Sequence, residues 1–269
     1  MLEIAGITRK TDFSPGHILN DYLIMSLTAE ELNKLGANVT MYTEDELGVK
    51  EIKENLIISM VQGPEGSKKL LELSRDKQLI MNTPESIINC YRYNLIKKME
   101  KSSIPFPLSR IITDRNKIPK EIKNIDGPLW LKRGDAHASC KEDVVKINSF
   151  REIPDGIDKF NKRGINRCAV QQHIEGFTVK FYGIQGTGFF YWYPQTNQIL
   201  PAFNEDDLSY IANLAAAALD LDVYGGDAII TPDLDIIIID MNDWPSFAPI
   251  KEKASKIIAN KFIQKIKQL

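Results

Sequence analysis

The stretch from residue 221 to 250 constrains most strongly how this chain can fold, because it joins two apolar runs to acidic residues. The runs, 228–230 and 236–239, are separated by a Pro-Asp turn signal, and the first follows a Gly-Gly pair. Asp227 opens the first run and Asp240 closes the second. The pattern predicts a hairpin of two strands with a carboxylate at the open end of each.

The acidic residues of this hairpin suggest a metal site. If residues 232–235 form the turn, Asp227 lies directly opposite Asp240 on the neighbouring strand. Asn242 is two residues beyond Asp240 and therefore shares its face. Opposed like charges are destabilising, and carboxylate and amide oxygens suit magnesium bound together with phosphate. We predict a magnesium site at Asp227, Asp240 and Asn242; solvated strand ends are the alternative.

Composition narrows the class of protein. The chain has 269 residues, of which 43% are hydrophobic and 26% charged, as in a soluble globular protein with room for two or three lobes. A net charge of −2 gives no signal for nucleic acid or an anionic membrane. Three widely spaced cysteines form no zinc or disulfide motif, which favours a reducing, cytoplasmic setting. The sequence lacks both the apolar run of a signal peptide and a stretch long enough to span a membrane.

The N-terminal part of the chain alternates strands with helices, which predicts parallel pairing in a small α/β lobe. Strands are predicted at 2–8, 38–42 and 55–60, and helices at 19–35 and 65–73. Ligands of such lobes bind beyond the carboxyl ends of the strands, here the loops 9–17 and 62–68. Arg9, Lys10 and His17 in the first loop point to a small anionic substrate; ordinary polar turns are the alternative.

The remainder of the chain alternates less regularly. A helix start at Thr83-Pro84 is followed by Pro105 and Pro107, which mark a lobe boundary. Strands are predicted at 108–113, 127–132, 144–147, 169–174, 177–184 and 188–193, and helices at 151–163, from 204 and from 251. The last two helices carry apolar residues at three- and four-residue spacing, so each buries one stripe.

Three basic side chains in this part are candidates for phosphate contacts. Lys132 and His137 belong to the segment KRGDAHASC, whose small residues allow a close approach to a ligand. A solvated hairpin loop is the alternative for that segment. Lys180 interrupts an apolar strand, and an unpaired buried charge is costly. An anionic ligand such as a phosphate supplies a partner; a lysine that reaches solvent from a strand edge is the alternative.

The order of these pieces resembles the ATP-grasp superfamily over nearly the whole chain. The resemblance implies a mixed α/β and α+β fold in which two α+β lobes enclose the nucleotide. Its lobes correspond to residues 1–105 (N-terminal α/β lobe), 106–182 (central lobe) and 183–269 (C-terminal lobe with the metal site).

The resemblance also implies roles for individual residues. Lys132 in GPLWLK matches a lysine that contacts nucleotide phosphates, and Lys180 in VKFYGI matches a second one. The GGD and DMNDWP segments match the elements that bind Mg²⁺, through Asp227, Asp240 and Asn242. The segment AVQQHIEG matches the hinge that holds the adenine of ATP, with Gln171, Gln172, His173 and Ile174 as the candidate contacts.

The resemblance spans two branches of the superfamily. Ligases of the ribosomal-protein-modifying and peptide-forming type usually carry Glu-x-Asn and then Pro-Gly, whereas this chain has Asp240 and Ser246. An aspartate there, together with the placement of His137, is similar to the inositol-phosphate kinases, in which the equivalent histidine lies near the transferred phosphate. The nearest match is an uncharacterised ATP-grasp protein.

The activity implied by the resemblance is an ATP- and Mg²⁺-dependent ligase that joins a carboxylate to an amine or thiol through an acylphosphate. Lys180 and His137 are then the candidate catalytic residues. A small-molecule kinase and a nucleotide-binding protein without turnover are the alternatives. The oligomeric state and the substrate are not specified by the sequence.

Overall fold

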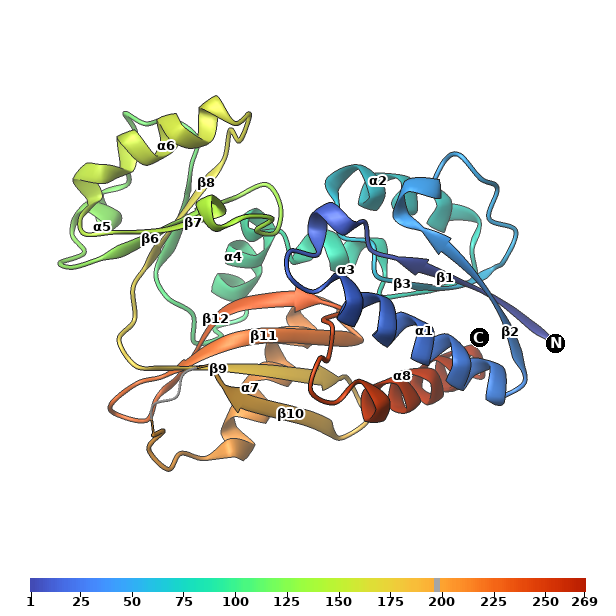
Figure 1. Cartoon of the computed structure of the whole chain (residues 1–269). Coiled ribbons are helices and arrows are strands. Elements are labelled where there is room, and N and C mark those ends of the chain that lie inside the picture. Colours follow the sequence, from blue (N-terminus) through green and yellow to red (C-terminus); the bar gives the residue numbers. More distant parts are fainter. Residues whose placement is uncertain (196–198) are drawn as a thin grey trace.

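Three four-stranded sheets organise the chain in a computed structural model that describes residues 1–195 and 199–269 (Figure 1). The first sheet is parallel, and the other two are antiparallel. This mixture confirms the predicted combination of an α/β lobe with two α+β lobes. No helix among the described residues is long and apolar enough to cross a membrane.

The N-terminal sheet has the strand order β2-β1-β3-β4. Its strands are β1 (Leu2–Thr8), β2 (Ala37–Thr43), β3 (Leu56–Ser59) and β4 (Leu79–Met81). The helices of this part are α1 (Ile18–Lys34), α2 (Pro64–Leu73), α3 (Pro84–Asn89) and α4 (Arg92–Lys101). The predicted start at Thr83-Pro84 is confirmed, because the Thr83 side chain accepts a hydrogen bond from the Ser86 N–H and caps α3. The three-residue β4 is too short to produce a sequence pattern and was not predicted.

The central sheet has the order β5-β8-β6-β7 and carries two helices. Its elements are β5 (Ser109–Ile112), α5 (Lys120–Lys123), β6 (Leu129–Arg133), β7 (Val144–Ile147), α6 (Ile153–Lys162) and β8 (Cys168–Gln172). Helix α6 buries Ile153, Ile157 and Phe160 against the sheet, with the three- and four-residue spacing of an amphipathic helix. These side chains belong to a hydrophobic core that the central lobe forms by itself.

The C-terminal sheet has the order β10-β9-β11-β12. Its elements are β9 (Phe177–Ile184), β10 (Phe189–Pro194), α7 (Glu205–Ala218), β11 (Val223–Ile230), β12 (Ile236–Asp243) and α8 (Lys251–Ile266). The predicted lobe boundary between residues 182 and 183 falls inside β9, which pairs with β11 over its whole length and with β10 over residues 179–184. Division of the chain by its sheets moves this boundary to the connection 173–176 between β8 and β9.

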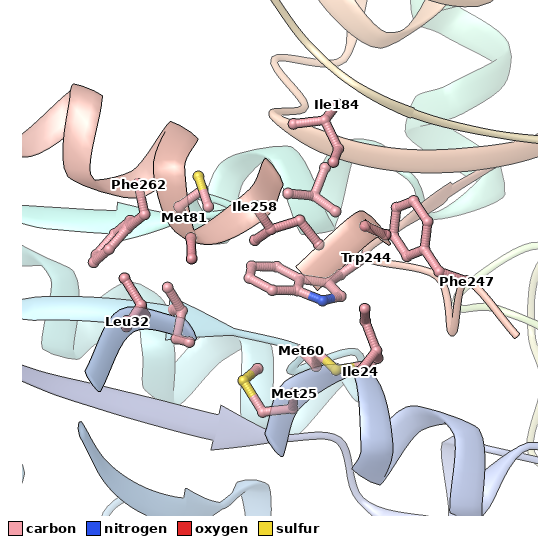
Figure 2. Packing of buried hydrophobic residues seen from close by; sticks show 14 of the residues in the cluster. Ile24, Met25, Leu32, Met60, Met81, Ile184, Trp244, Phe247, Ile258 and Phe262 are labelled. Atoms are coloured by element: carbon pink, nitrogen blue, oxygen red, sulfur yellow. The ribbon is translucent and has the colours of Figure 1, made fainter. Parts of the chain in front are cut away.

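One core joins the N-terminal and C-terminal lobes. Helix α8 packs against α1, and Trp244 lies between them with no exposed surface (Figure 2). Ile24 and Met25 of α1 and Ile258 and Phe262 of α8 belong to the same buried cluster. The two lobes therefore form a single body, and the central lobe stands apart from it (Figure 1).

The hairpin of β11 and β12 has the predicted pairing of Asp227 with Asp240, but reaches it by an unpredicted route. Near the turn the pairing is shifted by one residue, so that Ala228 lies opposite Ile238. Ile239 is the extra residue of a β-bulge between the two pairings. The turn between the paired residues Ile230 and Ile236 covers residues 231–235, one residue more than predicted. Within it the Thr231 N–H is bonded to the Asp235 carbonyl. The bulge offsets the longer turn, and the two carboxylates remain opposed.

Candidate active site

Two neighbouring cavities lie where the three sheets meet. One has a volume of about 390 Å³ and lies between the central sheet and the β11–β12 hairpin. The other, of about 260 Å³, lies between the hairpin, the β1–α1 loop and the segment around His137. Arg92, Ala138, Asp227 and Asp240 line both, and so form a shared wall.

The larger cavity brings together most of the side chains predicted to bind the nucleotide. Lys132, Gln171, Gln172, His173 and Ile174 all line it. Lys180, predicted to share that role, lines the smaller cavity instead. The five residues come from β6, β8 and the connection after β8, which pair or follow directly in the central sheet.

Lys132 is a deeply buried cation of the larger cavity, with 7% of its surface exposed. Its Nζ donates to Gln171 Oε1 at 2.6 Å and lies 3.5 Å from the carbonyl oxygen of Ile239, the bulge residue. Burial lowers the pKa of Lys132 to about 8, and Arg92 adds to this effect while Asp240 opposes it. An anionic ligand in the cavity therefore gains a partner whose charge is poorly compensated within the protein.

The connection after β8 is fixed at one end of the larger cavity. The Gln172 N–H donates to the Leu108 carbonyl, and the His173 N–H to the Pro128 carbonyl. The Trp130 indole N–H donates to His173 Nδ1 at 3.1 Å, and His173 Nε2 lies 2.9 Å from Glu175 and 3.0 Å from Lys146 Nζ. Trp130 thereby presents an aromatic ring to the cavity beside a rigid stretch of backbone.

The shared wall contains two carboxylates, each with its own cation. Lys180 Nζ lies 2.8 Å from Asp227 Oδ1, and Arg92 lies 3.3 Å from Asp240 Oδ2. Burial raises the pKa of Asp227 in spite of the nearby Lys180. Burial opposes ionisation of Asp240 too, but Arg92 and Lys132 outweigh it, so the pKa of Asp240 lies below its usual value.

The donor atoms at this wall fit a magnesium ion shared with a ligand. Asp227 and Asp240 are opposed in register, and Asn242 lines the smaller cavity beside them. Within the described ranges, no three His, Cys, Asp or Glu side chains are arranged to hold a metal by themselves. Mg²⁺ typically takes one or two carboxylates and completes its shell with water and phosphate oxygens, which matches this small, oxygen-only set.

The two glycines before Asp227 allow the chain segments at this wall to pack closely. A Cβ on Gly226 would lie 2.5 Å from the Asp240 carbonyl oxygen, and one on Gly225 would lie 2.8 Å from Pro245. Neither glycine has an unusual backbone conformation, so the constraint is space and not φ. The GGD motif is therefore explained by the close approach of the strands around Asp227 and Asp240.

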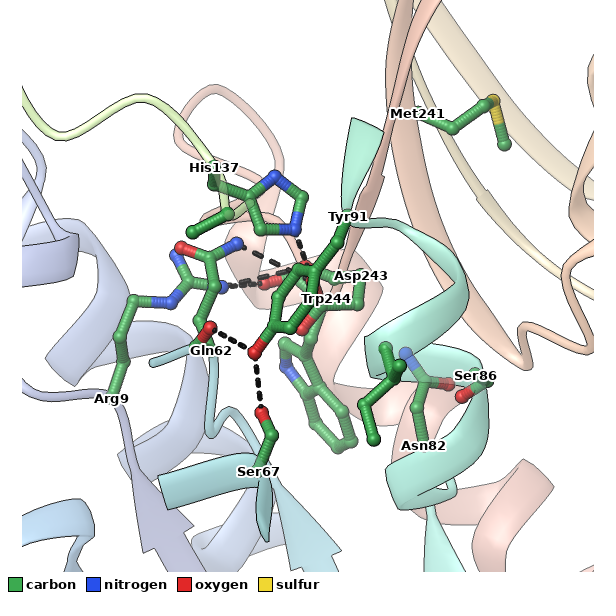
Figure 3. A network of polar contacts seen from close by, with 12 residues as sticks. Arg9, Gln62, Ser67, Asn82, Ser86, Tyr91, His137, Met241, Asp243 and Trp244 are labelled. Carbon is green, nitrogen blue, oxygen red and sulfur yellow. Dashed lines mark hydrogen bonds and ion pairs between the residues drawn. The ribbon is translucent and has the colours of Figure 1, made fainter. Parts of the chain in front are cut away.

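His137 lies in the smaller cavity and contacts a carboxylate that sequence reasoning did not single out. Its Nε2 is 3.2 Å from Asp243 Oδ1 (Figure 3). The same oxygen accepts a hydrogen bond from Gln62 Nε2 at 3.4 Å, and Tyr91 packs edge-on against the imidazole. These contacts connect His137 of the central lobe to both other lobes.

The β1–α1 loop closes the smaller cavity from the N-terminal side. Arg9 pairs with Asp21 at 3.0 Å and donates to the Trp244 carbonyl at 2.9 Å (Figure 3). His17 lines the cavity as the loop prediction expected, but Lys10 does not, because it pairs with Asp45 at 3.0 Å. Only part of the predicted basic loop therefore lines the cavity.

Several residues of the site were missed by sequence reasoning, namely Arg92, Asp243, Trp130 and Asp21. Gln62, in contrast, opens the predicted ligand loop 62–68 and lines the smaller cavity. Arg92 carries the clearest chemistry, because it bonds Asp240 and also donates to the carbonyls of Arg133 and Ala136. Its position as the first residue of α4 gives no pattern that marks a ligand contact.

Comparison with known proteins gives matches in structure and none in sequence. No family model matches the chain, and no curated protein does. The D-alanine–D-alanine ligase from Bacillus anthracis complexed with ATP has a TM-score of 0.74 at 12% identity, over 99% of this chain and 98% of that one. A RimK domain ATP-grasp protein from Sphaerobacter thermophilus has a TM-score of 0.72 at 15% identity, over 97% of this chain and 99% of that one. The VanG D-Ala:D-Ser ligase from Enterococcus faecalis has a TM-score of 0.72 at 16% identity, over 98% of each chain.

Proposed function

Because this chain has the ATP-grasp fold, we propose that it is an ATP- and Mg²⁺-dependent ligase that joins a carboxylate to an amine or thiol through an acylphosphate. The observation that carries the proposal is the wall shared by the two cavities. A nucleotide in the larger cavity and a small substrate in the smaller one would meet at Asp227, Asp240 and Arg92. That is the arrangement a phosphoryl transfer between two bound molecules requires.

We assign the larger cavity to ATP. The adenine would lie against Trp130 and the backbone of residues 172–174, and the phosphates would extend toward Lys132 and the shared wall. Lys132 is buried at the base of that path, and Arg92 and Lys180 stand on either side of the two carboxylates. Three cations around one triphosphate supply the charge stabilisation on which this chemistry depends.

Mg²⁺ bound by Asp227, Asp240 and Asn242 would neutralise phosphate charge and orient the transferred group. The side chains of this wall have complementary tasks. Lys180 and Arg92 hold the two carboxylates in place and offset their charge. His137 would contact the bound substrate or phosphate from the loop after β6, because its ring lines the smaller cavity.

The reaction would use the two cavities in sequence. A carboxylate oxygen of the first substrate would attack the γ-phosphorus, and ADP would leave with the cleaved oxygen. The second substrate would then attack the acyl carbon and release phosphate. Lys180 and His137 are the residues we expect to contact the transferred group, since both line the cavity in which the acyl group forms. The cavity is small and lined by basic and acidic groups, so both substrates are small, polar molecules and the first is an anion.

The test is the identity of the products. We expect ADP and inorganic phosphate in equal amounts from a panel of paired carboxylic acids and amines, and a hydroxamate when hydroxylamine replaces the amine. Lys180→Met, which removes the cation and keeps the chain length similar, should abolish both products. ADP with a phosphorylated product would establish a kinase instead. ATP binding without ADP release across the panel would contradict an enzymatic role.

A further inference from the structure

Part of the wall of the smaller cavity is one face of the C-terminal sheet. In the strand register Asp240 lies opposite Asp227, Asp227 opposite Lys180, and Lys180 opposite Tyr193. Residues directly opposite one another in antiparallel strands share a face, so these side chains form one row across β12, β11, β9 and β10 (Figure 1). All four line the cavity. Along the row the chemistry therefore changes from carboxylates and an ammonium group to a phenol at the β10 edge.

The β9–β10 end of this row is aromatic beyond Tyr193. Tyr182 lies two residues from Lys180 on β9, so it shares the same face, and it too lines the cavity. Phe13 of the β1–α1 loop lines the cavity from the N-terminal lobe. Its ring packs onto Gly63, where a Cβ would lie 2.3 Å from Phe13 Cε2. The proposed transfer of phosphate uses none of these rings, so they are available to the part of the substrate that does not react.

Tyr182 and Tyr193 form a hydroxyl pair at this end. Their oxygen atoms are 3.0 Å apart, and their ring centroids are 5.9 Å apart. Tyr182 is 4% exposed, whereas Tyr193 is half-buried, and burial raises the pKa of Tyr182, which keeps its hydroxyl protonated. A buried donor without an acceptor is costly, so the buried Tyr182 donates to Tyr193. A phenol carries a single proton, and Tyr193 therefore keeps its own O–H for solvent or for an acceptor on a ligand.

We propose that the first substrate is an aromatic carboxylic acid whose ring lies against Tyr193 and carries a hydrogen-bond acceptor. The inference rests on the proposed function, because a carboxylate enters this cavity as substrate only if an acyl group is formed there. Neighbouring strands lie about 4.8 Å apart, roughly the length of one six-membered ring. A carboxylate held at Lys180 therefore places a ring attached to it, directly or through one carbon, beside Tyr193.

Both features of the ring follow from the chemistry of Tyr193. Two aromatic rings in edge or offset contact gain more than the burial of their area, by about 3- to 10-fold in affinity. A saturated ring of similar size buries a similar area without that gain. An acceptor on the ring, such as a pyridine nitrogen, gives the free O–H of Tyr193 a partner. A plain phenyl ring would cover this O–H and leave it unbonded.

The test compares acids that differ in one property at a time. The probes are benzoate and phenylacetate, their 3- and 4-pyridyl analogues, and their cyclohexyl analogues. Calorimetric titration is carried out in the presence of Mg²⁺ and a non-hydrolysable ATP analogue. For at least one of the two chain lengths, we expect wild type to bind the phenyl acid about 3- to 10-fold more tightly than the cyclohexyl acid. A pyridyl acid of that length should bind about 3- to 10-fold more tightly again.

Two variants separate the ring of Tyr193 from its hydroxyl, and Tyr191 supplies a matched control. Tyr193→Phe should remove the preference for pyridyl over phenyl acids and keep that for phenyl over cyclohexyl acids. Tyr193→Leu should remove both preferences. Tyr191 lies two residues away on the same strand and face but is not among the described residues that line the cavity. Tyr191→Leu should therefore bind every acid like wild type, although it removes the same group from the same edge strand.

Four results would overturn the inference. The first is a wild type that binds no phenyl acid more tightly than its cyclohexyl analogue, and the second is one that binds no pyridyl acid more tightly than the phenyl acid. The third is a pyridyl preference that survives in Tyr193→Phe. The fourth is an equal loss of preference in Tyr191→Leu and Tyr193→Leu, which would assign the effect to the stability of the edge strand.

Release of ADP is measured in parallel, with hydroxylamine in place of the second substrate. Ring-selective binding without release of ADP would overturn the proposed reaction and leave the recognition of the aromatic acid standing. Release of ADP with the cyclohexyl acids, as fast as with their aromatic analogues, would overturn the inference and leave the ligase reaction standing. The two failures are therefore distinguishable.

Discussion

The position of Lys132 in the fold determines the pKa of its side chain. Its ammonium group is buried, bonded to Gln171 and close to Arg92, and the pKa of Lys132 falls to about 8. Bound triphosphate would favour the charged form, so ATP binding above about pH 8 requires the uptake of a proton. We expect the Kd for ATP to rise as the pH is increased from 7 to 9.5, by up to about tenfold per pH unit above the pKa.

The matched variant for this prediction is Lys132→Met, measured by calorimetric ATP titration across the same pH range. Loss of a charged hydrogen bond should weaken ATP binding at pH 7 by about 10- to 100-fold. The remaining affinity should depend much less on pH. An equal pH dependence in wild type and variant would place the titrating group elsewhere, and unaltered ATP affinity would separate Lys132 from the phosphates.

The metal assignment is testable with two neighbouring residues that differ in their partners. Asp240 holds the buried Arg92, so Asp240→Asn should lower both Mg²⁺-dependent turnover and stability, the latter by about 3 kcal/mol for a broken buried pair. Asn242 forms no ion pair, and Asn242→Ala should lower the apparent Mg²⁺ affinity with a change in unfolding free energy below about 1 kcal/mol. Turnover at several Mg²⁺ concentrations and urea unfolding give both quantities. Turnover of Asn242→Ala that responds to Mg²⁺ like wild type would remove this residue from the site.

At the residue scale, the sequence predicts contacts between residues that are close along the chain and misses contacts between residues that are far apart along it. The pairing of Asp227 with Asp240 was predicted from the hairpin pattern, and strand periodicity places Asn242 on the same face as Asp240. Arg92 reaches Asp240 across 148 residues of sequence, and Gln62 reaches Asp243 across 181. No spacing rule links such positions, because their contact depends on how the lobes dock.

Among the elements, the segment from β6 to β7 is held at its base by one carboxylate. Asp143 is fully buried and accepts from the Ser139 N–H at 2.7 Å, and Arg163 and Arg133 lie within 2.5 and 3.5 Å of it. Burial alone would raise the pKa of Asp143, but the Ser139 and Arg163 hydrogen bonds outweigh it and hold the pKa far below its usual value. The segment that carries His137 is therefore fixed at its C-terminal end.

A pH profile tests this anchor. The folded-state pKa of Asp143 is depressed, so its stabilisation is present above the unfolded value of about 4 and is lost as the pH falls below it. We expect Asp143→Asn to lower the unfolding free energy by about 1–3 kcal/mol at pH 7. The difference from wild type should shrink between pH 4 and 3 in urea unfolding. A difference that stays constant over this range would mean that the carboxylate charge is not the stabilising feature.

The β11–β12 hairpin shows the limit of register prediction at the same scale. The pairing of Asp227 with Asp240 was predicted correctly from an assumed turn at 232–235. The observed turn starts a residue earlier, and the bulge at Ile239 restores the pairing. A bulge in an isoleucine run leaves no mark on composition, because every residue of the run is equally apolar. The pairing was thus predicted correctly, although the bulge that produces it was not predicted.

For the whole molecule, the distribution of cores determines which parts unfold together. The N-terminal and C-terminal lobes share the cluster around Trp244, whereas the central lobe has its own. Phe262→Ala in the shared core and Phe160→Ala in the central core remove the same side chain from buried sites, at a cost of about 3–5 kcal/mol each. We expect Phe262→Ala to speed hydrogen exchange in both β1 and β11, and Phe160→Ala to speed it only in β5 to β8.

Hydrogen-exchange mass spectrometry checks this pair of variants. Faster exchange throughout the chain in Phe160→Ala would contradict an independent central core. The alternation of strands and helices in the sequence predicted the N-terminal α/β lobe, but it did not show that the last helix packs onto the first. That contact lies between two amphipathic stripes, and many other partners would satisfy the same stripes equally well.

The placement of the tryptophans allows their fluorescence to report on ligand entry and on unfolding separately. Trp130 lies in the larger cavity against His173, Trp192 pairs with Glu205, and Trp244 is enclosed in the shared core. An indole in a dry, apolar site emits at shorter wavelength than one beside polar groups. Emission from Trp130 would therefore follow nucleotide entry while that from Trp244 follows unfolding. A chain in which Trp192 is replaced by phenylalanine would separate the two signals without any added label.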